Sequence, residues 1–153
     1  MEFKHNVEKE CQFDENLPQI YAVYSDFSQS IMNVLQNAID SMYKKDTKKL
    51  SVITQQDDEK IIVIIKDTGC GISEENYIKL FDPFYTTKPN LDEKKGDEPT
   101  GTGLGLSTVH NLLTPYGVKI EVISELNIGT SVILRIPSKV TQIKGQKEKK
   151  VLL

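Results

Sequence analysis

The sequence is poor in the residues that build disulfide frameworks and metal clusters. Its 153 residues include two cysteines, Cys11 and Cys70, and two histidines, His5 and His110. The cysteines have no C-x-x-C spacing and no cluster of histidines beside them, which excludes the patterns typical of a disulfide framework or a cysteine-ligated metal. We therefore expect both thiols to be reduced.

The sequence also lacks an excess of basic residues and any long apolar run. A net charge of −3 argues against a dedicated nucleic-acid binder, whose electrostatic footprint is a strongly basic domain. No apolar run approaches the length of a membrane span, and the charged start MEFKHNVEKE lacks the apolar segment of a secretory signal. These absences predict a cytoplasmic domain without a nucleic-acid partner.

A chain of this length is expected to form one domain, because about 150 residues bury roughly two thirds of the surface of the unfolded chain. No internal repeat is present. Apolar patterning extends over residues 1–137, whereas the basic tail at 138–153 has too little of it to fold alone. We predict one folded domain over 1–137, followed by a flexible tail.

Apolar spacing predicts the elements of this domain. Residues 25–44 have helical spacing, with Ser25 as the predicted N-cap; their apolar face consists of Phe27, Ile31, Leu35, Ala38 and Met42. The run IIVII within 61–66 has no polar alternation, as expected of a central strand. The other predicted elements are strands at 3–12, 17–23, 50–54, 118–124 and 130–137, and helices at 73–80 and from the glycine run at 101–105 to Thr114.

Three glycines stand at alternate positions in GTGLGLSTVHNLL, residues 101–113, just before a helical pattern. Glycine costs backbone entropy, so such a cluster needs a reason. The free N–H groups and positive dipole end of a helix bind anions, and glycine lets the backbone approach a phosphate oxygen closely. The spacing matches neither the P-loop nor the dinucleotide fingerprint. Taken alone, this run is only a weak indication of phosphate binding.

A polar stripe follows the long helix opposite its apolar face. Its members are Asn33, Asn37, Asp40 and Lys44, spaced four, three and four residues apart. The plain interpretation is a solvated helix face. Asparagine is a poor helix former, however, and two of them one turn apart favour side-chain oxygens held for a ligand or a metal.

An aspartate ends the buried strand and is followed by two glycines, Asp67, Gly69 and Gly71. A carboxylate only accepts hydrogen bonds, so it would pair with the exocyclic amine of adenine and disfavour the carbonyl oxygen of guanine. The glycines would let the backbone approach a flat base. A tight Asp-Thr-Gly turn is the structural alternative.

Five motifs occur in order along nearly the whole chain. They are Asn33-Val-Leu-Gln-Asn37-Ala38, Asp67-Thr-Gly69-Cys-Gly71-Ile, Phe81-Asp-Pro-Phe84-Tyr-Thr-Thr-Lys88, Gly101-Thr-Gly103-Leu104-Gly105-Leu and Gly129-Thr130. The set resembles the ATP-binding domain of two-component sensor histidine kinases, of the GHKL or Bergerat-fold superfamily. The resemblance implies an α/β two-layer sandwich, in which a mixed, mostly antiparallel sheet of about five strands carries three helices on one face.

The resemblance also implies roles for single residues. Asn37 would hold Mg²⁺, and Asp67 would read adenine in a pocket shaped by Gly69 and Gly71. Asn33 stands where related ATPases carry a glutamate that activates water, and since an amide cannot act as that base, transfer to another nucleophile is favoured over hydrolysis. The remaining implied nucleotide contacts are Phe81 and Phe84 at the hinge of the lid, Gly101, Gly103, Leu104 and Gly105 at the phosphates, and Thr130.

The lid, residues 85–102, departs from the family pattern. It carries a long charged insert between Lys88 and Gly101, expected to be disordered without nucleotide. It has no arginine to steady the transferring phosphoryl group, so Lys88, Lys94 or Lys95 would have to replace it. Asp40 stands where a lysine is common, and Gly117-Val118 stands where the family often has Gly-Gly.

The resemblance implies transfer of the γ-phosphoryl of MgATP to a histidine on a separate dimerising hairpin, which passes it to a response regulator. Neither His5 nor His110 has the context of a phosphoacceptor, so the chain resembles an excised catalytic domain, monomeric alone, of a dimeric parent. Both a membrane-anchored and an unanchored parent fit the sequence. The alternatives are an ATPase or serine kinase on the same scaffold and a non-catalytic ATP-sensing module.

Overall fold

The computed structural model describes residues 7–93, 95–139 and 150–151. Five strands form one mixed sheet in the order β1-β3-β4-β6-β5, in which β1 pairs parallel with β3 and all other pairs are antiparallel. The strands are β1 (Glu8–Phe13), β3 (Lys49–Asp57), β4 (Lys60–Asp67), β5 (Lys119–Glu125) and β6 (Gly129–Pro137). A two-residue pair joins β2 (Ile20–Tyr21) to β7 (Lys150–Val151).

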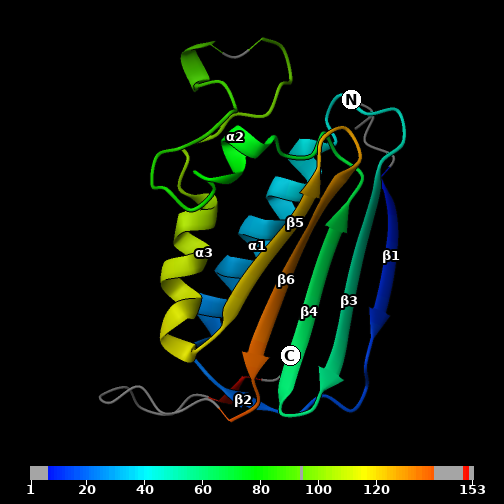
Figure 1. Cartoon of the computed structure of the whole chain (residues 1–153), viewed down its shortest axis with the longest axis vertical. Coiled ribbons are helices and arrows are strands. Elements are labelled where there is room, and N and C mark those ends of the chain that lie inside the picture. Colours follow the sequence, from blue (N-terminus) through cyan, green and yellow to red (C-terminus); the bar gives the residue numbers. More distant parts are fainter. Residues whose placement is uncertain (1–6, 94, 140–149, 152–153) are drawn as a thin grey trace.

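The helices α1 (Tyr24–Ser41), α2 (Glu74–Tyr77) and α3 (Gly105–Leu113) lie on one face of this sheet (Figure 1). Two 3₁₀ turns, η1 (Leu91–Glu93) and η2 (Thr114–Tyr116), lie in the lid and after α3. The predicted two-layer α/β sandwich with a mixed, mostly antiparallel five-stranded sheet is therefore confirmed.

β4 is the central strand, as its unbroken apolar run predicted. It pairs with β3 on one edge and with β6 on the other. Ile61, Val63 and Ile65 belong to the buried core that the helices cover. Since strand side chains alternate between faces, Asp67 continues this inward-facing row at the end of the strand. The strand thereby sets a carboxylate below the helical layer.

α1 packs on the sheet through a face rotated slightly from the predicted one. Its buried residues are Phe27, Ser30, Val34 and Ala38, whereas Ile31 and Leu35 lie at the margin. The buried Ser30 hydroxyl donates a hydrogen bond of 2.6 Å to the Asp26 carbonyl, so a polar residue is accommodated in the core. Burial of this face of α1 leaves the polar stripe outside the core, at the side of the helix.

The boundaries of α1 differ from the prediction at both ends. The helix begins at Tyr24, its N-cap is Val23, and no side chain caps it, so Ser25 as N-cap is wrong. It ends at Ser41 rather than at residue 44. The C-cap residue, Met42, is fully buried in the core. The Ser41 carbonyl then accepts a hydrogen bond of 3.0 Å from the Cys70 N–H. Tertiary contacts, not propensity, fix this helix end.

Several other elements are shorter or longer than predicted. The expected helix at 73–80 is reduced to α2, the strand at 17–23 is reduced to β2, and the two hairpin strands β3 and β4 extend to the turn at Asp58. Of the predicted tail, residues 140–149 and 152–153 lie outside the described residues, and Lys150–Val151 forms a strand that was not predicted. His5 and Lys94 also lie outside the described residues.

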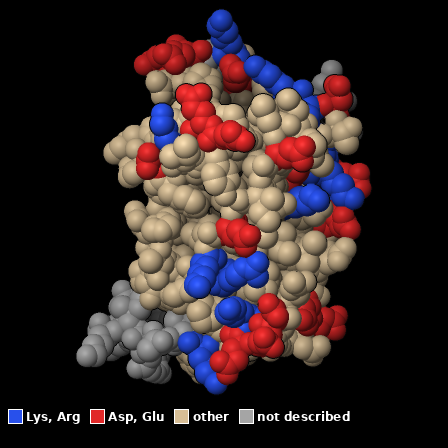
Figure 2. Space-filling view, in the orientation of Figure 1, with Lys and Arg blue, Asp and Glu red and all other residues tan. Residues whose placement is uncertain are grey.

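The surface seen in Figure 2 carries acidic and basic side chains interspersed, both at the lid end and at the opposite end. Within the part of the chain that the structure describes, every helix is too short or too polar to cross a bilayer.

Candidate nucleotide-binding site

A cavity of about 530 Å³ lies between α1, the end of β4, the lid and the start of α3. Ligand pockets of drug-sized molecules span about 300–1,000 Å³, so the space suits a nucleotide. Of the predicted site residues, the cavity is lined by Asn33, Asn37, Asp67, Gly71, Lys88, Gly101, Gly103, Gly105 and Thr130. Gly69, Phe81, Phe84 and Leu104 are not among its lining residues.

The polar stripe of α1 forms one wall of this cavity. Asn33, Asn37, Asp40 and Lys44 all line it. The Asn33 amide lies 3.5 Å from the Gly105 carbonyl, and a Cβ on Gly105 would stand 3.3 Å from the Asn37 amide nitrogen. The polar side chains of α1 therefore meet the backbone of Gly105 at the start of α3, and the stripe faces a concave site rather than bulk solvent.

At the sheet end of the cavity, the Asp67 carboxylate is 5% exposed. Its Oδ1 accepts hydrogen bonds from the Gly69 N–H at 2.7 Å and the Ser41 hydroxyl at 3.0 Å. Burial raises the pKa of Asp67 above its ordinary value, against the lowering effect of these hydrogen bonds and of one from the Thr130 backbone. Among the described residues no cation pairs with this buried carboxylate, which leaves it a strong hydrogen-bond acceptor.

Ser41 is a site residue that the sequence reasoning missed. It stands one turn beyond Asn37 on the same stripe, and that spacing was the available signal. Gly69 leaves room for Ser41, because a Cβ at Gly69 would collide with the Ser41 hydroxyl. Gly69 therefore permits the contact between α1 and the Asp67 turn instead of lining the cavity. The Thr130 hydroxyl pairs with that of Ser124 at 2.8 Å.

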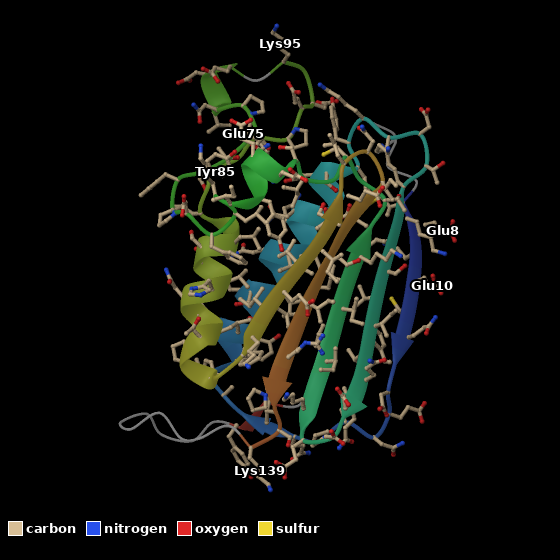
Figure 3. The ribbon with its side chains drawn as sticks, viewed as in Figure 1. Glu8, Glu10, Glu75, Tyr85, Lys95 and Lys139 are labelled. Carbon is tan, nitrogen blue, oxygen red and sulfur yellow. The ribbon has the colours of Figure 1, made fainter. Side chains whose placement is uncertain are left out.

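The lid contacts α1 and the segment that follows it through two ion pairs across the cavity. The Lys88 ammonium lies 2.6 Å from Asp40 Oδ2 and 3.0 Å from Asn37 Oδ1. The Lys44 ammonium lies 3.1 Å from Glu98 Oε1. Lys95 points away at the far end of the insert (Figure 3). Among the described candidates for the missing lid arginine, Lys88 is the one whose ammonium lies in the cavity.

The two ends of the lid are held against each other. The Gly101 N–H lies 3.4 Å from the Pro89 carbonyl, and the Lys88 N–H donates to the Thr86 hydroxyl at 3.1 Å. At the near end, the Tyr85 hydroxyl donates to the Asn76 side-chain oxygen at 2.6 Å, and both residues line the cavity. Nothing in the sequence indicated this last pair, because a turn between the two residues brings them together.

Phe81 and Phe84 behave differently, although both were predicted to pack at the hinge of the lid. Phe81 packs against the core, and its ring centroid lies 5.7 Å from that of His110. The Phe84 side chain is 77% exposed, so the predicted packing of its ring is wrong. Its backbone adopts φ of +65°, and Gly103 packs against the Phe84 carbonyl group. Leu104, the N-cap of α3, is 39% exposed.

Gly103→Ala is expected to disrupt this lid base and to lower nucleotide affinity by about tenfold or more. Gly103 has φ of +72°, where a Cβ is strained, and that Cβ would also collide with the Phe84 backbone. Gly96→Ala is the matched control, because Gly96 has φ of +63° but open space around it. Calorimetric titration of both variants with ADP checks the difference. Equal affinities would show that the Phe84 contact does not shape the site.

The sequence matches one ATPase family and is similar to several sensor proteins. The family model described as histidine kinase-, DNA gyrase B-, and HSP90-like ATPase matches residues 22–140. Sensor protein RprX of Bacteroides fragilis is 34% identical over 121 residues, covering 78% of this chain and 22% of RprX. Sensor protein SrrB of Staphylococcus aureus is 34% identical over 109 residues, covering 71% of this chain and 18% of SrrB. The chain thus spans about a fifth of the length of these relatives.

Among solved structures, the nucleotide-free catalytic domain of the histidine kinase ThkA is similar with a TM-score of 0.69 and 28% identity, covering 87% of this chain and 81% of that one. A full-length ShkA complex with AMPPNP shares the fold with a TM-score of 0.69 at 22% identity, covering 86% of this chain and 26% of that one.

Proposed function

Since this chain belongs to the family of histidine kinase-, DNA gyrase B- and HSP90-like ATPases, we propose that it is the part of a sensor histidine kinase that binds MgATP and transfers its γ-phosphoryl group to a histidine. The acceptor histidine lies on a separate hairpin domain of a dimeric parent, and a response regulator receives the phosphoryl group from it. One observation carries the proposal: a buried carboxylate and a cation-holding amide oxygen line the same cavity.

The Asp67 end of the cavity suits adenine. The Asp67 carboxylate is desolvated and accepts from Ser41 and Gly69 at one oxygen. An ionised carboxylate has about four acceptor positions, so capacity remains for the amine of adenine. Guanine presents a carbonyl oxygen in that place, which the carboxylate disfavours. This supports adenine over guanine as the base.

The Asn37 end suits the phosphates and a magnesium ion. Asn37 Oδ1 already accepts from the Lys88 ammonium, so this oxygen points at a place where a cation is held. α3 begins beside it with no side-chain cap and no acidic residue in its first turn, which leaves its N-terminal N–H groups and dipole for an anion. Asn37 would hold the Mg²⁺ ion, which when bound neutralises phosphate charge during transfer.

The chain's own side chains favour transfer over hydrolysis. Asn33 lies at the cavity wall, and its amide cannot take a proton from water. Within the described residues the single histidine, His110, is exposed on α3 with its ring against Phe81. An imidazole nitrogen from another domain would therefore attack the γ-phosphorus in line as the bond to ADP breaks. Positioning and charge neutralisation by Asn37 and Lys88 would carry the catalysis.

Two measurements test this function. Calorimetric titration with ADP, ATP and GTP, each with and without Mg²⁺, should give adenine-selective binding that magnesium strengthens. Incubation with γ-labelled ATP and the parent's hairpin domain should then put an acid-labile label on the hairpin histidine. Label on serine, or rapid release of free phosphate by the domain alone, would indicate the serine kinase or the ATPase. Binding without any transfer would indicate a non-catalytic sensor.

A further inference from the structure

The Lys88 ammonium lies between two oxygens presented by adjacent turns of α1. Asp40 Oδ2 is 2.6 Å away and Asn37 Oδ1 is 3.0 Å away. The other carboxylate oxygen of Asp40 accepts from the Gln36 side chain at 2.7 Å. The carboxylate is thus oriented from one side by its own helix and holds the lysine from the other side.

The Asp40–Lys88 pair is less exposed to solvent than the other ion pair of the lid, which joins Glu98 to Lys44 just after α1. The Asp40 side chain is 11% exposed and that of Lys88 is 27% exposed, whereas the Lys44 side chain in the Lys44–Glu98 pair is 79% exposed. Exposed pairs contribute little, because water screens both charges. The partly buried Asp40–Lys88 pair has less competition from water, so it is the stronger of the two lid contacts.

The position of the ammonium conflicts with the proposed metal. Mg²⁺ takes oxygen ligands at about 2.0–2.1 Å in octahedral geometry. An ammonium bound to Asn37 Oδ1 fills the space beside that oxygen and repels a divalent cation. Lys88 and a magnesium ion therefore compete for Asn37 Oδ1.

We propose that Asp40 is a positioning residue: in the free protein it holds the Lys88 ammonium on the Asn37 oxygen, and magnesium nucleotide binds only by displacing the lysine. This inference rests on the proposed function, because it concerns the same site. After the magnesium nucleotide has displaced Lys88 from Asn37, the lid would still hold this lysine near the phosphates. The apparent affinity is then the intrinsic affinity reduced by the fraction of molecules in which the pair is open.

Asp40→Asn tests the proposal, because it removes the charge that holds Lys88 and keeps the shape of the side chain. If the pair is closed in most free molecules, this variant should bind Mg·ADP about fivefold more tightly than the parent chain. Asp40→Glu restores the charge and should return the affinity toward the parent value. Lys95→Met is the control, since Lys95 is exposed at the far end of the insert, and it should leave Mg·ADP affinity within about twofold.

A second readout reports the lid without any ligand. The chain has no tryptophan, so Leu91→Trp, at a residue 79% exposed in the insert, gives a single tryptophan that can be excited selectively over the tyrosines. Its anisotropy in the free protein should fall when Asp40→Asn or Lys88→Met is added, because both variants open the same contact. It should be unchanged by Lys95→Met. Thermal melts check that each variant is folded.

Every outcome of these two measurements either supports or overturns the proposal. Tighter Mg·ADP binding by Asp40→Asn together with lower anisotropy supports the proposal. Weaker binding would show that Asp40 helps to hold the metal, and unchanged binding or anisotropy would show that the contact does not restrain Lys88; either overturns it. If the parent chain binds no nucleotide, the proposed function fails, whereas the anisotropy comparison still tests the Asp40–Lys88 contact.

Discussion

Asp67→Asn is expected to lower ATP affinity by about 10- to 150-fold, because a hydrogen bond to a charged group contributes about 1.5–3 kcal/mol. The asparagine amide also presents donors to the amine of adenine, which is itself a donor. The free protein should unfold at the same temperature or a higher one. Burial raises the pKa of Asp67, so its ionised form at neutral pH disfavours the folded state, and a neutral side chain removes that cost.

The raised pKa of Asp67 also determines how stability and ATP affinity should change with pH. A carboxyl whose pKa is raised on folding keeps its proton in the native state to a higher pH than in the unfolded chain. Its contribution to stability is therefore present at low pH and is lost as pH rises through the raised pKa. Adenine binding needs the ionised form, so ATP affinity should weaken as pH falls through that same pKa, at a higher pH than for an ordinary aspartate.

Calorimetric titration across pH and thermal melts of the free protein check these statements. Asp57→Asn is the control, since Asp57 is exposed at the end of β3. The difference between the parent and Asp67→Asn isolates this carboxyl from the titration of the phosphates. An Asp67→Asn protein that binds ATP as the parent does would place the base elsewhere. One that loses binding and stability together would make Asp67 a structural residue.

Asn37→Ala is expected to remove the magnesium-dependent part of nucleotide affinity and to lower phosphotransfer by about 1,000-fold, as loss of one group that stabilises transition-state charge does. The ratio of ADP affinities with and without Mg²⁺ should fall to about one, because the proposed oxygen ligand is gone. Alanine is the best helix former, and Asn37 is only half-buried, so the fold should not suffer.

The same titrations on Gln29→Ala provide a control on the same helix, because Gln29 is exposed and is not among the residues that line the cavity. Asn37→Asp keeps an oxygen and should retain part of the magnesium response. A magnesium effect that persists in Asn37→Ala would assign the ion to other groups. Phosphotransfer that survives would show that metal positioning by Asn37 is not required.

Local sequence patterns determined the layers of this protein. Apolar residues at helical spacing predicted α1, because they form one buried face of a helix. An unbroken apolar run predicted that β4 is the central strand, because such a strand is covered on both sides or paired on both edges. The five motifs, through their resemblance to a known family, predicted that Asn37, Asp67 and Gly103 belong to one site, and all three line the same cavity in the structure.

The tertiary structure decided what depends on residues far apart in the chain. Met42 is drawn into the core and ends α1 early, Phe84 turns its ring outward so that Gly103 can approach its backbone, and Ser41 reaches Asp67 only because Gly69 leaves room. Asp40 and Lys88 are separated by 48 residues, and the sequence singled out each of them without indicating their contact. Their contact exists because the folded lid closes over α1, and no local propensity encodes such a pairing.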